Sequence, residues 1–359
     1  MAKRLRAGVI GATGMVGQRF VTLLAEHPWF ELTVVAASSR SAGQTYAQAV
    51  AGRWMLPVPI PEGVAELMVY DAADVKAVAS QVDFVFCAVE MDKDATKALE
   101  DTYASAGVPV VSNNSAHRGT PDVPMLMPEI NPEHLKVIPA QQRRLGTKRG
   151  FIVTNPNCSI QSYVPALHAL WEFGPRQVAA CTYQAISGAG KTFATWPEMV
   201  DNVIPYIAGE EAKSEQEPRK IWGQVAADAI VPSAEPQITA QCIRVPASDG
   251  HMAAVFVSFV RKPSQEEILA KWAAFQGEPQ RLQLPSAPKP FIKYMLEDDR
   301  PQTKLDRAYA GGMGITVGRL RPDTVFDYKF ICLSHNTVRG AAGGAVLIAE
   351  LLAVKGYFD

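Results

Sequence analysis

A single cysteine near the middle of the chain has the clearest capacity for chemistry. Cys158 follows a short apolar run at residues 151–153 and an Asn-Pro-Asn turn at residues 155–157. Apolar side chains recur three and four residues apart after it, which predicts a helix that begins near the cysteine. Unpaired N–H groups and the positive end of the helix dipole at such a position favour the thiolate. We therefore expect the pKa of Cys158 to be lowered and its thiolate to be a nucleophile.

Cysteine also has a plainer interpretation, because most intracellular cysteines are small buried apolar residues. The cysteines of the chain are odd in number and widely spaced, and they are Cys87, Cys158, Cys181, Cys242 and Cys332. Such spacing indicates neither a disulfide framework nor a zinc site, and we predict no metal. Cys87 lies inside an apolar strand pattern and is expected to be structural.

A glycine-rich turn near the N-terminus predicts a dinucleotide site. The apolar residues 7–10 lead into a G-x-x-G-x-x-G turn, and a helical apolar pattern follows it. This spacing meets the same demands as the commoner G-x-G-x-x-G: a tight turn, close approach to a pyrophosphate, and close packing of helix on strand. The candidate cofactor contacts in this turn are Gly11, Thr13, Gly14, Met15, Val16 and Gly17.

The segment after the second apolar run predicts which dinucleotide is bound. Residues 32–37 lead into Ser38, Ser39 and Arg40, whereas a site for NAD usually places Asp or Glu there for the ribose 2′-hydroxyl. Serines and an arginine suit a 2′-phosphate instead, so we expect NADP to be preferred over NAD. The alternative is that this segment is only a solvated loop.

Polar residues in the second half of the chain could assist the cysteine. His251 stands between a segment broken by Pro and Gly and an alternating strand pattern. A histidine is the natural base for a cysteine nucleophile, although a lone histidine at such a junction is usually structural. Glu210 and Lys213 are three residues apart and would share one face of a helix. The usual interpretation of such a pair is a solvated surface contact.

The elements that must position these residues indicate an α/β chain with two domains. Strand-like runs at 82–88 and 108–111 alternate with helical stretches, as in a doubly wound parallel sheet. We expect an N-terminal Rossmann-type domain over residues 1–157 that binds NADP. An α+β catalytic and dimerisation domain is expected over residues 158–335. A helix of small residues at 336–359 is expected to pack back onto the first domain.

Composition excludes several classes of protein. The length of 359 residues suggests two domains, and 48% hydrophobic with 20% charged residues is typical of a soluble globular enzyme. A net charge of −1 gives no attraction to nucleic acid or to an anionic membrane. The N-terminus lacks the apolar segment of a signal peptide, and no apolar run has the length of a membrane span. We therefore expect a cytoplasmic protein.

Taken together and in order, a series of short motifs closely resembles the aspartate-β-semialdehyde dehydrogenase family, most strongly its archaeal and fungal branch. The motifs span essentially the whole chain and are GATGMVG, SSRSAG, SNNSAHR, TNPNCSIQ, QAISGAG, GEEAK, RVPASDGH and HNTVRGAAGG. The resemblance implies NADPH-dependent reductive dephosphorylation of L-4-aspartyl phosphate to L-aspartate 4-semialdehyde, in lysine, threonine and methionine biosynthesis. It also implies a homodimer or homotetramer, with strands of the second domain at the interface.

The resemblance further implies roles for matching residues in catalysis and cofactor binding. Cys158 matches the nucleophile that forms a thioester, and His251 matches the acid–base residue. Gln184 matches a glutamine that helps to place the acyl intermediate. Outside the glycine turn, the residues that match cofactor contacts are Ser187, Gly188 and Asn336.

Five matching residues are implied to bind the substrate. Arg244 matches the arginine that grips the carboxylate, for which its planar fork is suited, and Glu210 matches the partner of the ammonium group. Arg118 and Lys213 match the cationic pair for phosphate, and Asn157 matches a neighbouring asparagine of the phosphate site.

Two departures from the family pattern leave details of the site open. Met252 and Ala253 stand where the family commonly has Thr-Glu or Ser-Glu, and Ala212 stands where a third acid is often found. It therefore stays open whether Glu210 or Glu211 binds the substrate.

Several other functions remain as alternatives. The nearest is a malonyl-CoA reductase or another acyl-CoA or acyl-phosphate reductase, although Asn157 before Cys158 favours an acyl phosphate. An acetylglutamyl-phosphate reductase fits less well, because Glu210 and Lys213 suit a free amino group and a phosphate. A non-catalytic NADP-binding sensor or a cysteine hydrolase would not require both the glycine turn and the full set of catalytic matches.

Overall fold

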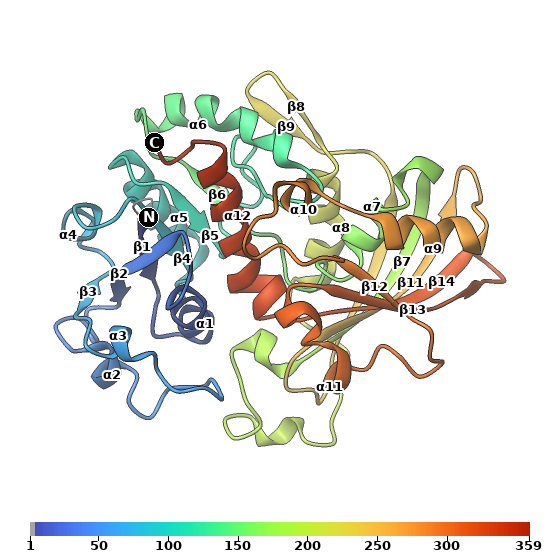
Figure 1. Cartoon of the computed structure of the whole chain (residues 1–359), viewed down its shortest axis with the longest axis horizontal. Coiled ribbons are helices and arrows are strands. Elements are labelled where there is room, and N and C mark those ends of the chain that lie inside the picture. Colours follow the sequence, from blue (N-terminus) through green and yellow to red (C-terminus); the bar gives the residue numbers. More distant parts are fainter. Residues whose placement is uncertain (1–3) are drawn as a thin grey trace.

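Two six-stranded sheets lie side by side in the computed structural model, which describes residues 4–359 (Figure 1). Residues 1–3, with which the predicted first domain and its basic N-terminus begin, lie outside the described residues. The C-terminal helix runs between the two sheets in the view of Figure 1.

The first sheet is wholly parallel and lies in the N-terminal part of the chain. Its strands are β1 (Leu5–Ile10), β2 (Phe30–Ala37), β3 (Val69–Asp71), β4 (Phe84–Cys87), β5 (Val110–Ser112) and β6 (Ile152–Thr154). Their spatial order is β3-β2-β1-β4-β5-β6, with every neighbouring pair parallel. This is the strand order of the doubly wound dinucleotide-binding fold, so the predicted Rossmann-type sheet is confirmed.

Helices of the first half flank this sheet, and one of them begins directly at the glycine turn. They are α1 (Met15–Leu24), α2 (Tyr46–Ala49), α3 (Glu62–Ala65), α4 (Val75–Ala79), α5 (Lys93–Ser105), the 3-10 turn η1 (Pro132–Val137) and α6 (Ile138–Leu145). The apolar face of α1 carries Phe20, which stacks on Phe86 of β4 with ring centroids 4.6 Å apart. The strand, turn and helix expected around the first glycines are therefore present.

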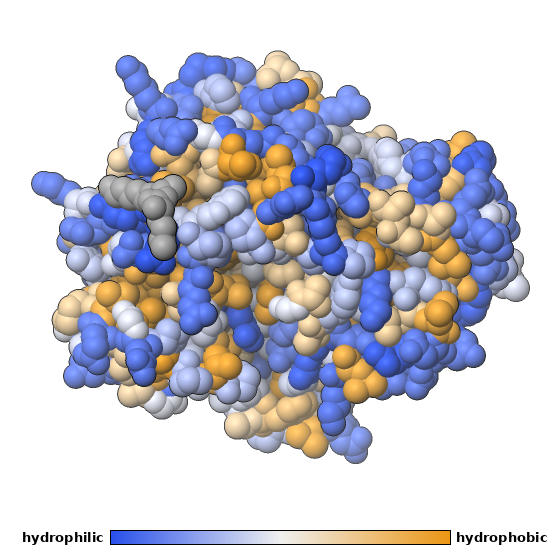
Figure 2. Space-filling model, viewed as in Figure 1, coloured by the Kyte–Doolittle hydropathy of each residue, from blue (hydrophilic) through white to orange (hydrophobic). Residues whose placement is uncertain are grey.

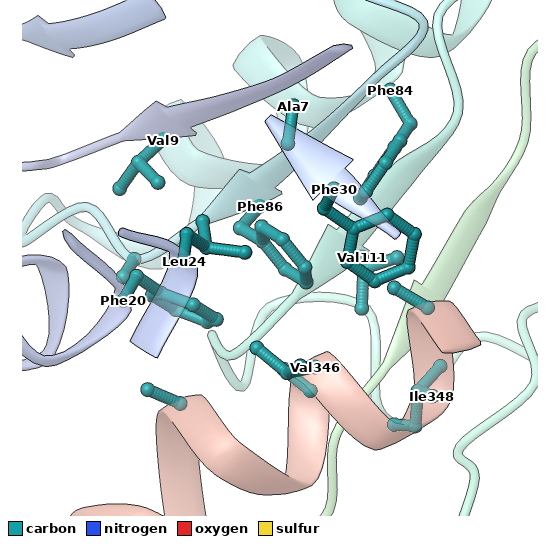
Figure 3. Packing of buried hydrophobic residues seen from close by; sticks show 14 of the residues in the cluster. Ala7, Val9, Phe20, Leu24, Phe30, Phe84, Phe86, Val111, Val346 and Ile348 are labelled. Carbon is teal, nitrogen blue, oxygen red and sulfur yellow. The ribbon is translucent and has the colours of Figure 1, made fainter. Parts of the chain in front are cut away.

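The C-terminal helix packs against the core of the first sheet. Helix α12 (Gly343–Val354) adds Val346 and Ile348 to the cluster that contains Phe20, Phe86 and Val111 (Figure 3). Nearly every residue of α12 is buried, so it is an internal helix and has no solvated face.

The start of this helix differs from the prediction. A π-helical turn, η6 (Val338–Ala342), precedes α12, and Ala341 has φ −143° and ψ −106°, which breaks the helix. Asn336 lies in a turn before both elements, where its side chain bonds the Gly250 N–H and the Ser187 hydroxyl. The expectation of one helix over 336–359 is therefore wrong at both ends. Tertiary hydrogen bonds hold Asn336 outside the helix, and α12 ends at Val354.

The second sheet is mixed and belongs to the C-terminal part of the chain. Its strands are β7 (Pro175–Gln184), β10 (Gln237–Arg244), β11 (His251–Phe259), β12 (Ile292–Met295), β13 (Ile315–Pro322) and β14 (Tyr328–Ser334), in the order β10-β7-β11-β14-β13-β12. A hairpin of β8 (Gln224–Ala226) and β9 (Ala229–Val231) lies apart from it. Mixed pairing confirms the expected α+β character of this half.

The helices around this sheet are mostly short. They are α7 (Val164–His168), α8 (Glu210–Ile221), α9 (Gln265–Ala274), α10 (Glu278–Leu282) and α11 (Thr303–Asp306), with the 3-10 turns η2 (Trp171–Phe173), η3 (Ile186–Ala189), η4 (Pro197–Met199) and η5 (Tyr309–Gly312). Along β11, buried residues alternate with half-buried ones, so one face of the sheet is covered and the other is partly open.

The molecular surface gives no sign of an apolar belt on the face in view. Figure 2 shows mainly hydrophilic residues there, with smaller apolar areas among them. Within residues 4–359, no helix combines the length and the apolar character needed to cross a membrane.

Candidate active site

The loop that carries Cys158 differs from the predicted strand–turn–helix. Strand β6 ends at Thr154, and residues 158–163 form turns before α7 begins at Val164. The side-chain Oδ1 of Asn157 accepts the Ser159 N–H at 2.7 Å, which draws that N–H away from a helical pattern. Cys158 therefore lies six residues before the α-helix, and the expected position in its first turn is wrong.

The electrostatic surroundings of Cys158 also correct the prediction. Burial raises the pKa of its thiol to about 12, and the nearby Glu210 carboxylate adds to the rise. Arg118, Arg244 and Lys213 act in the opposite direction but do not outweigh burial. The expectation of a lowered pKa is therefore wrong in this structure, where the thiol is protonated at neutral pH and needs further activation to attack.

His251 is the first residue of β11 and is completely buried. Its Nδ1 accepts the backbone N–H of Ala185 at 3.1 Å, so a neutral ring in this orientation carries its proton on Nε2. Burial and the Arg244 charge lower the pKa of His251 to about 3, which keeps the ring neutral at physiological pH. Nε2 has no partner among the described residues and is free to donate to a reacting oxygen.

Parallel strands bring Gln184 and Arg244 to the same edge of the second sheet. Gln184 ends β7, Arg244 ends β10, and the two residues are partners in the register. Arg244 Nη1 donates to the Ala185 carbonyl at 2.6 Å. A Cβ on Gly188 would lie 2.9 Å from both Arg244 Nη1 and His251 Nε2, so only glycine lets this backbone approach both side chains.

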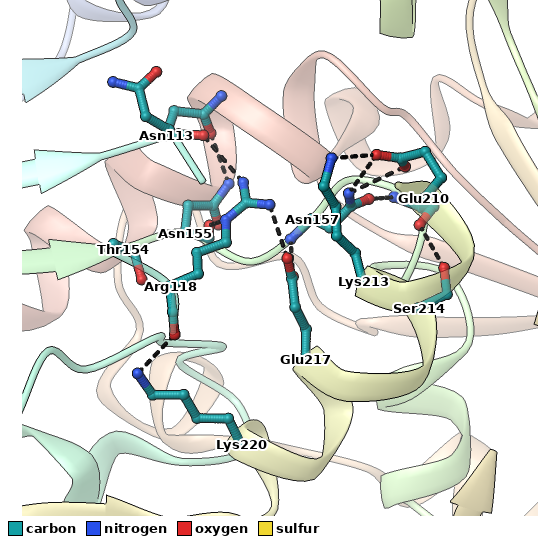
Figure 4. Close-up of polar contacts among 12 residues, drawn as sticks. Asn113, Arg118, Thr154, Asn155, Asn157, Glu210, Lys213, Ser214, Glu217 and Lys220 are labelled. Carbon is teal, nitrogen blue, oxygen red and sulfur yellow. Dashed lines mark hydrogen bonds and ion pairs between the residues drawn. The ribbon is translucent and has the colours of Figure 1, made fainter. Parts of the chain in front are cut away.

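The acid that opens α8 joins these residues to the cysteine loop. The Glu210 carboxylate accepts from Asn157 Nδ2 at 3.1 Å and from Lys213 Nζ at 2.7 Å (Figure 4). It also accepts from Gln184 Nε2 at 3.1 Å. Burial by itself would raise the Glu210 pKa, but Lys213 and these hydrogen bonds lower it overall. Glu211 faces away and accepts from Gln241 Nε2 at 2.7 Å. Of the two neighbouring acids, Glu210 is the one beside Cys158.

Arg118 lies on the other side of the loop, within a set of acceptors that the sequence did not indicate. Its Nε donates to the Asn155 carbonyl at 2.9 Å, its Nη1 to Glu217 Oε1 at 3.0 Å, and its Nη2 to the Asn113 carbonyl at 3.1 Å (Figure 4). Glu217 also accepts the backbone N–H of Asn157 at 2.6 Å. The signal that could have revealed Glu217 is its position seven residues after Glu210, which puts both acids on one helix face.

One cavity of about 280 Å³ brings together the predicted nucleophile, most of the predicted substrate-binding residues and part of the predicted cofactor contacts. Its predicted lining residues are Val16, Arg118, Asn157, Cys158, Ser187, Gly188, Glu210, Lys213 and Asn336. Its further lining residues, which sequence reasoning missed, are Asn113, Asn114, Ser115, Thr337, Gly340 and Ala341. Three predicted residues do not line the cavity but contact residues that do. Gln184 contacts Glu210, and the Arg244 and His251 side chains lie beside Gly188. The exposed residues 38–40 follow β2 and do not line this cavity.

The glycine turn has the geometry that a pyrophosphate site requires. Gly11 has φ +87°, and a Cβ there would lie 2.3 Å from the Ala88 carbonyl oxygen. A Cβ on Gly17 would lie 2.1 Å from the Gly11 carbonyl oxygen. Gly14 caps α1 without a side-chain hydrogen bond, so the first N–H groups of that helix remain for an oxyanion. The residues present therefore fit the pyrophosphate of a dinucleotide, and Val16 of the same turn also lines the cavity that contains Cys158.

The segment before α12 closes the cavity behind Cys158. A Cβ on Gly340 would lie 2.7 Å from the Cys158 Cβ, so glycine is required there. The neighbouring Arg339 makes a buried bidentate ion pair with Glu129, with both distances 2.7 Å, and donates to Gln161 Oε1 at 3.1 Å. Sequence alone offered no signal for this pairing, because its partners are 210 residues apart.

Comparisons with known proteins identify the family of the chain. Residues 6–138 match the family model "Semialdehyde dehydrogenase, NAD binding domain", and residues 165–339 match "Semialdehyde dehydrogenase, dimerisation domain". An aspartate-semialdehyde dehydrogenase of Aspergillus fumigatus is 43% identical over 98% of both chains. One from Archaeoglobus fulgidus is 44% identical over 97% of this chain and 98% of its own. The crystal structure of the Candida albicans aspartate semialdehyde dehydrogenase with NADP is similar at a TM-score of 0.88 and 38% identity, covering 99% of this chain and 100% of that one.

Proposed function

The chain belongs to the aspartate-semialdehyde dehydrogenase family, and we propose that it reduces L-4-aspartyl phosphate to L-aspartate 4-semialdehyde with release of phosphate. The reaction is reversible, uses NADPH and serves lysine, threonine and methionine biosynthesis. The observation that carries the proposal is one cavity lined by Cys158, the cations Arg118 and Lys213, and Val16 of the glycine turn. A thiol, a phosphate-binding pair and a dinucleotide turn in one cavity combine acyl transfer with reduction.

The cofactor is NADP, in agreement with the fit of the glycine turn. When bound, NADPH supplies the hydride that reduces the acyl group. The N-terminus of α1 offers N–H groups to its pyrophosphate, and Ser187, Gly188 and Asn336 lie where the cavity continues from Val16. Ser38, Ser39 and Arg40 are exposed at the end of β2 and suit the 2′-phosphate. On this basis residues 1–157 form the cofactor domain and residues 158–335 the catalytic and dimerisation domain.

The substrate's three charged groups have complementary partners around Cys158. The Nη1 of Arg244 is committed to the Ala185 carbonyl, and its Nε and Nη2 have no hydrogen-bond partner within residues 4–359. That edge of the guanidinium can donate two parallel hydrogen bonds to a carboxylate. Glu210 pairs with the substrate ammonium group, while Arg118, Lys213 and Asn157 hold the phosphate.

Substrate binding itself helps to activate the thiol. Part of the rise in the Cys158 pKa comes from the Glu210 charge, and an ammonium group bound to Glu210 offsets that charge. With the Glu210 charge offset, less of the rise in the Cys158 pKa remains, and the thiolate is easier to form than in the free enzyme. The thiolate attacks the acyl carbon and the bond to the phosphate oxygen breaks, so a thioester on Cys158 remains. The proton lost from the thiol leaves with the phosphate, which departs as HPO4²⁻.

His251 manages protons at the oxygen of the reacting carbonyl. Its neutral ring offers Nε2–H to the oxyanion that develops there, since Nδ1 is occupied by the Ala185 N–H. After reduction the hemithioacetal collapses, which releases the aldehyde and returns the Cys158 thiolate. Gln184, which donates to Glu210, helps to place this intermediate.

We also propose an assembly and a cellular location for the protein. The match to a dimerisation domain supports an oligomer, and a homodimer or homotetramer is proposed. The partly open face of the second sheet includes the half-buried Phe256 and suits a subunit contact. A cytoplasmic location is proposed along with this assembly.

One assay tests the reaction directly. The purified protein is given aspartate semialdehyde with NADP⁺ and phosphate, and parallel reactions replace phosphate with coenzyme A or NADP⁺ with NAD⁺. We expect NADP⁺ reduction that requires phosphate and is slower with NAD⁺. Reduction that requires coenzyme A instead would assign the chain to the acyl-CoA reductases, and no reduction with either would reject the proposed function.

A further inference from the structure

We propose that Glu217 is a positioning residue that aims Arg118 at the phosphate group and holds the peptide before Cys158. The inference rests on the proposed role of Arg118 in phosphate binding. Glu217 lies on α8, is buried, and does not line the cavity. It therefore acts through Arg118 and Asn157 and does not touch the substrate.

The two oxygens of Glu217 have different partners. Oε1 accepts from Arg118 Nη1 at 3.0 Å, and Oε2 accepts from the Asn157 backbone N–H at 2.6 Å (Figure 4). One buried carboxylate thus joins the phosphate-site cation to the residue directly before the nucleophile. Hydrogen bonds with an ionised partner are short and strong, so this link is stiff.

Counting donors shows what the link does to Arg118. A guanidinium has five N–H donors in one plane. Three of them are used by the Asn155 carbonyl, Glu217 and the Asn113 carbonyl. Two donors remain, one on each terminal nitrogen, and the three fixed bonds determine where they point. Arg118 and Cys158 line the same cavity, and on the proposed role of Arg118 these two donors are the ones that bind the phosphate.

A lysine on the same helix holds the Arg118 backbone independently. Lys220 Nζ donates to the carbonyls of Arg118 and Thr120, both at 2.7 Å. Burial lowers the pKa of Lys220 to about 8, yet both carbonyl contacts remain within hydrogen-bond distance. Lys220 therefore holds the Arg118 backbone independently of Glu217, so within Arg118 the loss of Glu217 affects only the guanidinium, which keeps its two carbonyl contacts.

Two consequences follow if Glu217 has this role. Without its carboxylate, Arg118 Nη1 loses an acceptor and the guanidinium can turn away from the phosphate position. The Asn157 N–H, which is buried, also loses its acceptor, and the loop before Cys158 becomes less well held. Phosphate binding and acyl transfer should both suffer, while the cofactor site on α1 should not.

The test measures phosphate binding by a readout that needs no turnover. Iodoacetamide alkylates Cys158 in the full-length protein, and inorganic phosphate is titrated as a protecting anion while mass spectrometry follows the Cys158 peptide. For Glu217→Gln we expect the half-protecting phosphate concentration to rise about tenfold, as loss of a charged hydrogen bond predicts. The KM for phosphate should rise by a similar factor, and the dissociation constant for NADPH should stay unchanged. Glu217→Asp, which keeps the charge but is shorter, should lie between wild type and Glu217→Gln.

Matched variants separate positioning from a general structural role. Glu215 is on the same helix and accepts the Ala240 N–H at 3.0 Å, so Glu215→Gln removes a comparable carboxylate without touching Arg118. It should leave phosphate protection unchanged. In an Arg118→Lys background, which has no fork to aim, Glu217→Gln should add little further loss.

The outcomes distinguish this inference from the proposed function. Equal phosphate protection in wild type and Glu217→Gln, or equal losses in both Arg118 backgrounds, would overturn the positioning role. If phosphate protects Cys158 in wild type but the enzyme assay shows no NADP⁺ reduction, the proposed reaction is wrong. The comparison of phosphate protection between wild type and Glu217→Gln then still tests the positioning role. If phosphate does not protect Cys158 in wild type at any concentration, the inference is wrong.

Discussion

Helices α8 and α12 each have 12 residues, and they are anchored in opposite ways. Helix α12 is apolar almost all round and joins the core of the first sheet, with Glu350 as its buried charged exception. Helix α8 is mostly polar, and its buried residues include Glu210, Ser214, Glu217 and Lys220. Apolar burial is strong but non-directional, whereas hydrogen bonds fix atoms in particular places. The comparison indicates that α12 contributes mainly stability and α8 mainly the geometry of the site.

The largest expected effect is a loss of activity from α8. Glu210→Gln keeps the shape but removes the charge that pairs with the substrate ammonium group. We expect kcat/KM to fall about a thousandfold, ~4 kcal/mol, as for breaking a buried charge pair. The thermal unfolding midpoint should change much less than the activity, because the amide oxygen can still accept hydrogen bonds from the donors around it.

Glu211→Gln is the matched control, since Glu211 faces β10 and accepts from Gln241. It should retain kcat/KM. Equal losses in the two variants, measured by initial rates over a range of substrate concentrations, would remove Glu210 from the site.

The opposite behaviour is expected for α12. Leu351 is completely buried in the core of the first domain, so Leu351→Ala should lower the free energy of unfolding by ~3 kcal/mol through lost burial and a cavity. The kcat of the folded fraction should remain that of wild type. Urea unfolding and steady-state kinetics on the same samples measure both quantities, with the half-exposed Val354→Ala as a control that loses little. A tenfold fall in kcat for Leu351→Ala would contradict the claim that α12 contributes mainly to stability.

A smaller effect concerns pH and should be confined to the catalytic half. The pKa of His251 is lowered to about 3 in the folded chain, whereas in the unfolded chain it lies near ~6.5. Between these values the unfolded chain binds a proton that the folded chain does not, so stability is lost as pH falls through that window. Between pH 7 and pH 5 this loss should be about 2 kcal/mol.

The free energy of unfolding of His251→Gln should therefore fall by about 2 kcal/mol less than that of wild type between pH 7 and pH 5. Urea unfolding at both pH values measures this difference. Leu351→Ala should show the pH dependence of wild type, because it removes no titratable group. An identical pH dependence in wild type and His251→Gln would show that His251 does not titrate as proposed.

The parts of the molecule that could be predicted from sequence are those governed by local pattern. The glycine turn with α1, the alternation of strands and helices, and the shared face of Glu210 and Lys213 all depend on residues close together in the chain. The structure contains each of them, because hydrophobic periodicity and turn chemistry act over short distances.

The parts that could not be predicted depend on contacts between distant residues. The turn at Cys158 forms through Asn157, and the raised Cys158 pKa comes from burial and from Glu210, which is 52 residues away in the sequence. Glu217 looks like an ordinary solvated charge until the fold brings Arg118 to it from 99 residues away. Similarly, the need for glycine at 340 becomes visible only when the segment before α12 lies against Cys158.

The central claim is that Cys158 carries the acyl group, and trapping that group tests it most directly. The protein is incubated with NADP⁺ and aspartate semialdehyde without phosphate, quenched in acid, digested and analysed by mass spectrometry. We predict an aspartyl thioester on the Cys158 peptide that disappears when phosphate is added before the quench. An unmodified Cys158 in an enzyme that turns over, or an acyl group on a different residue, would contradict the account.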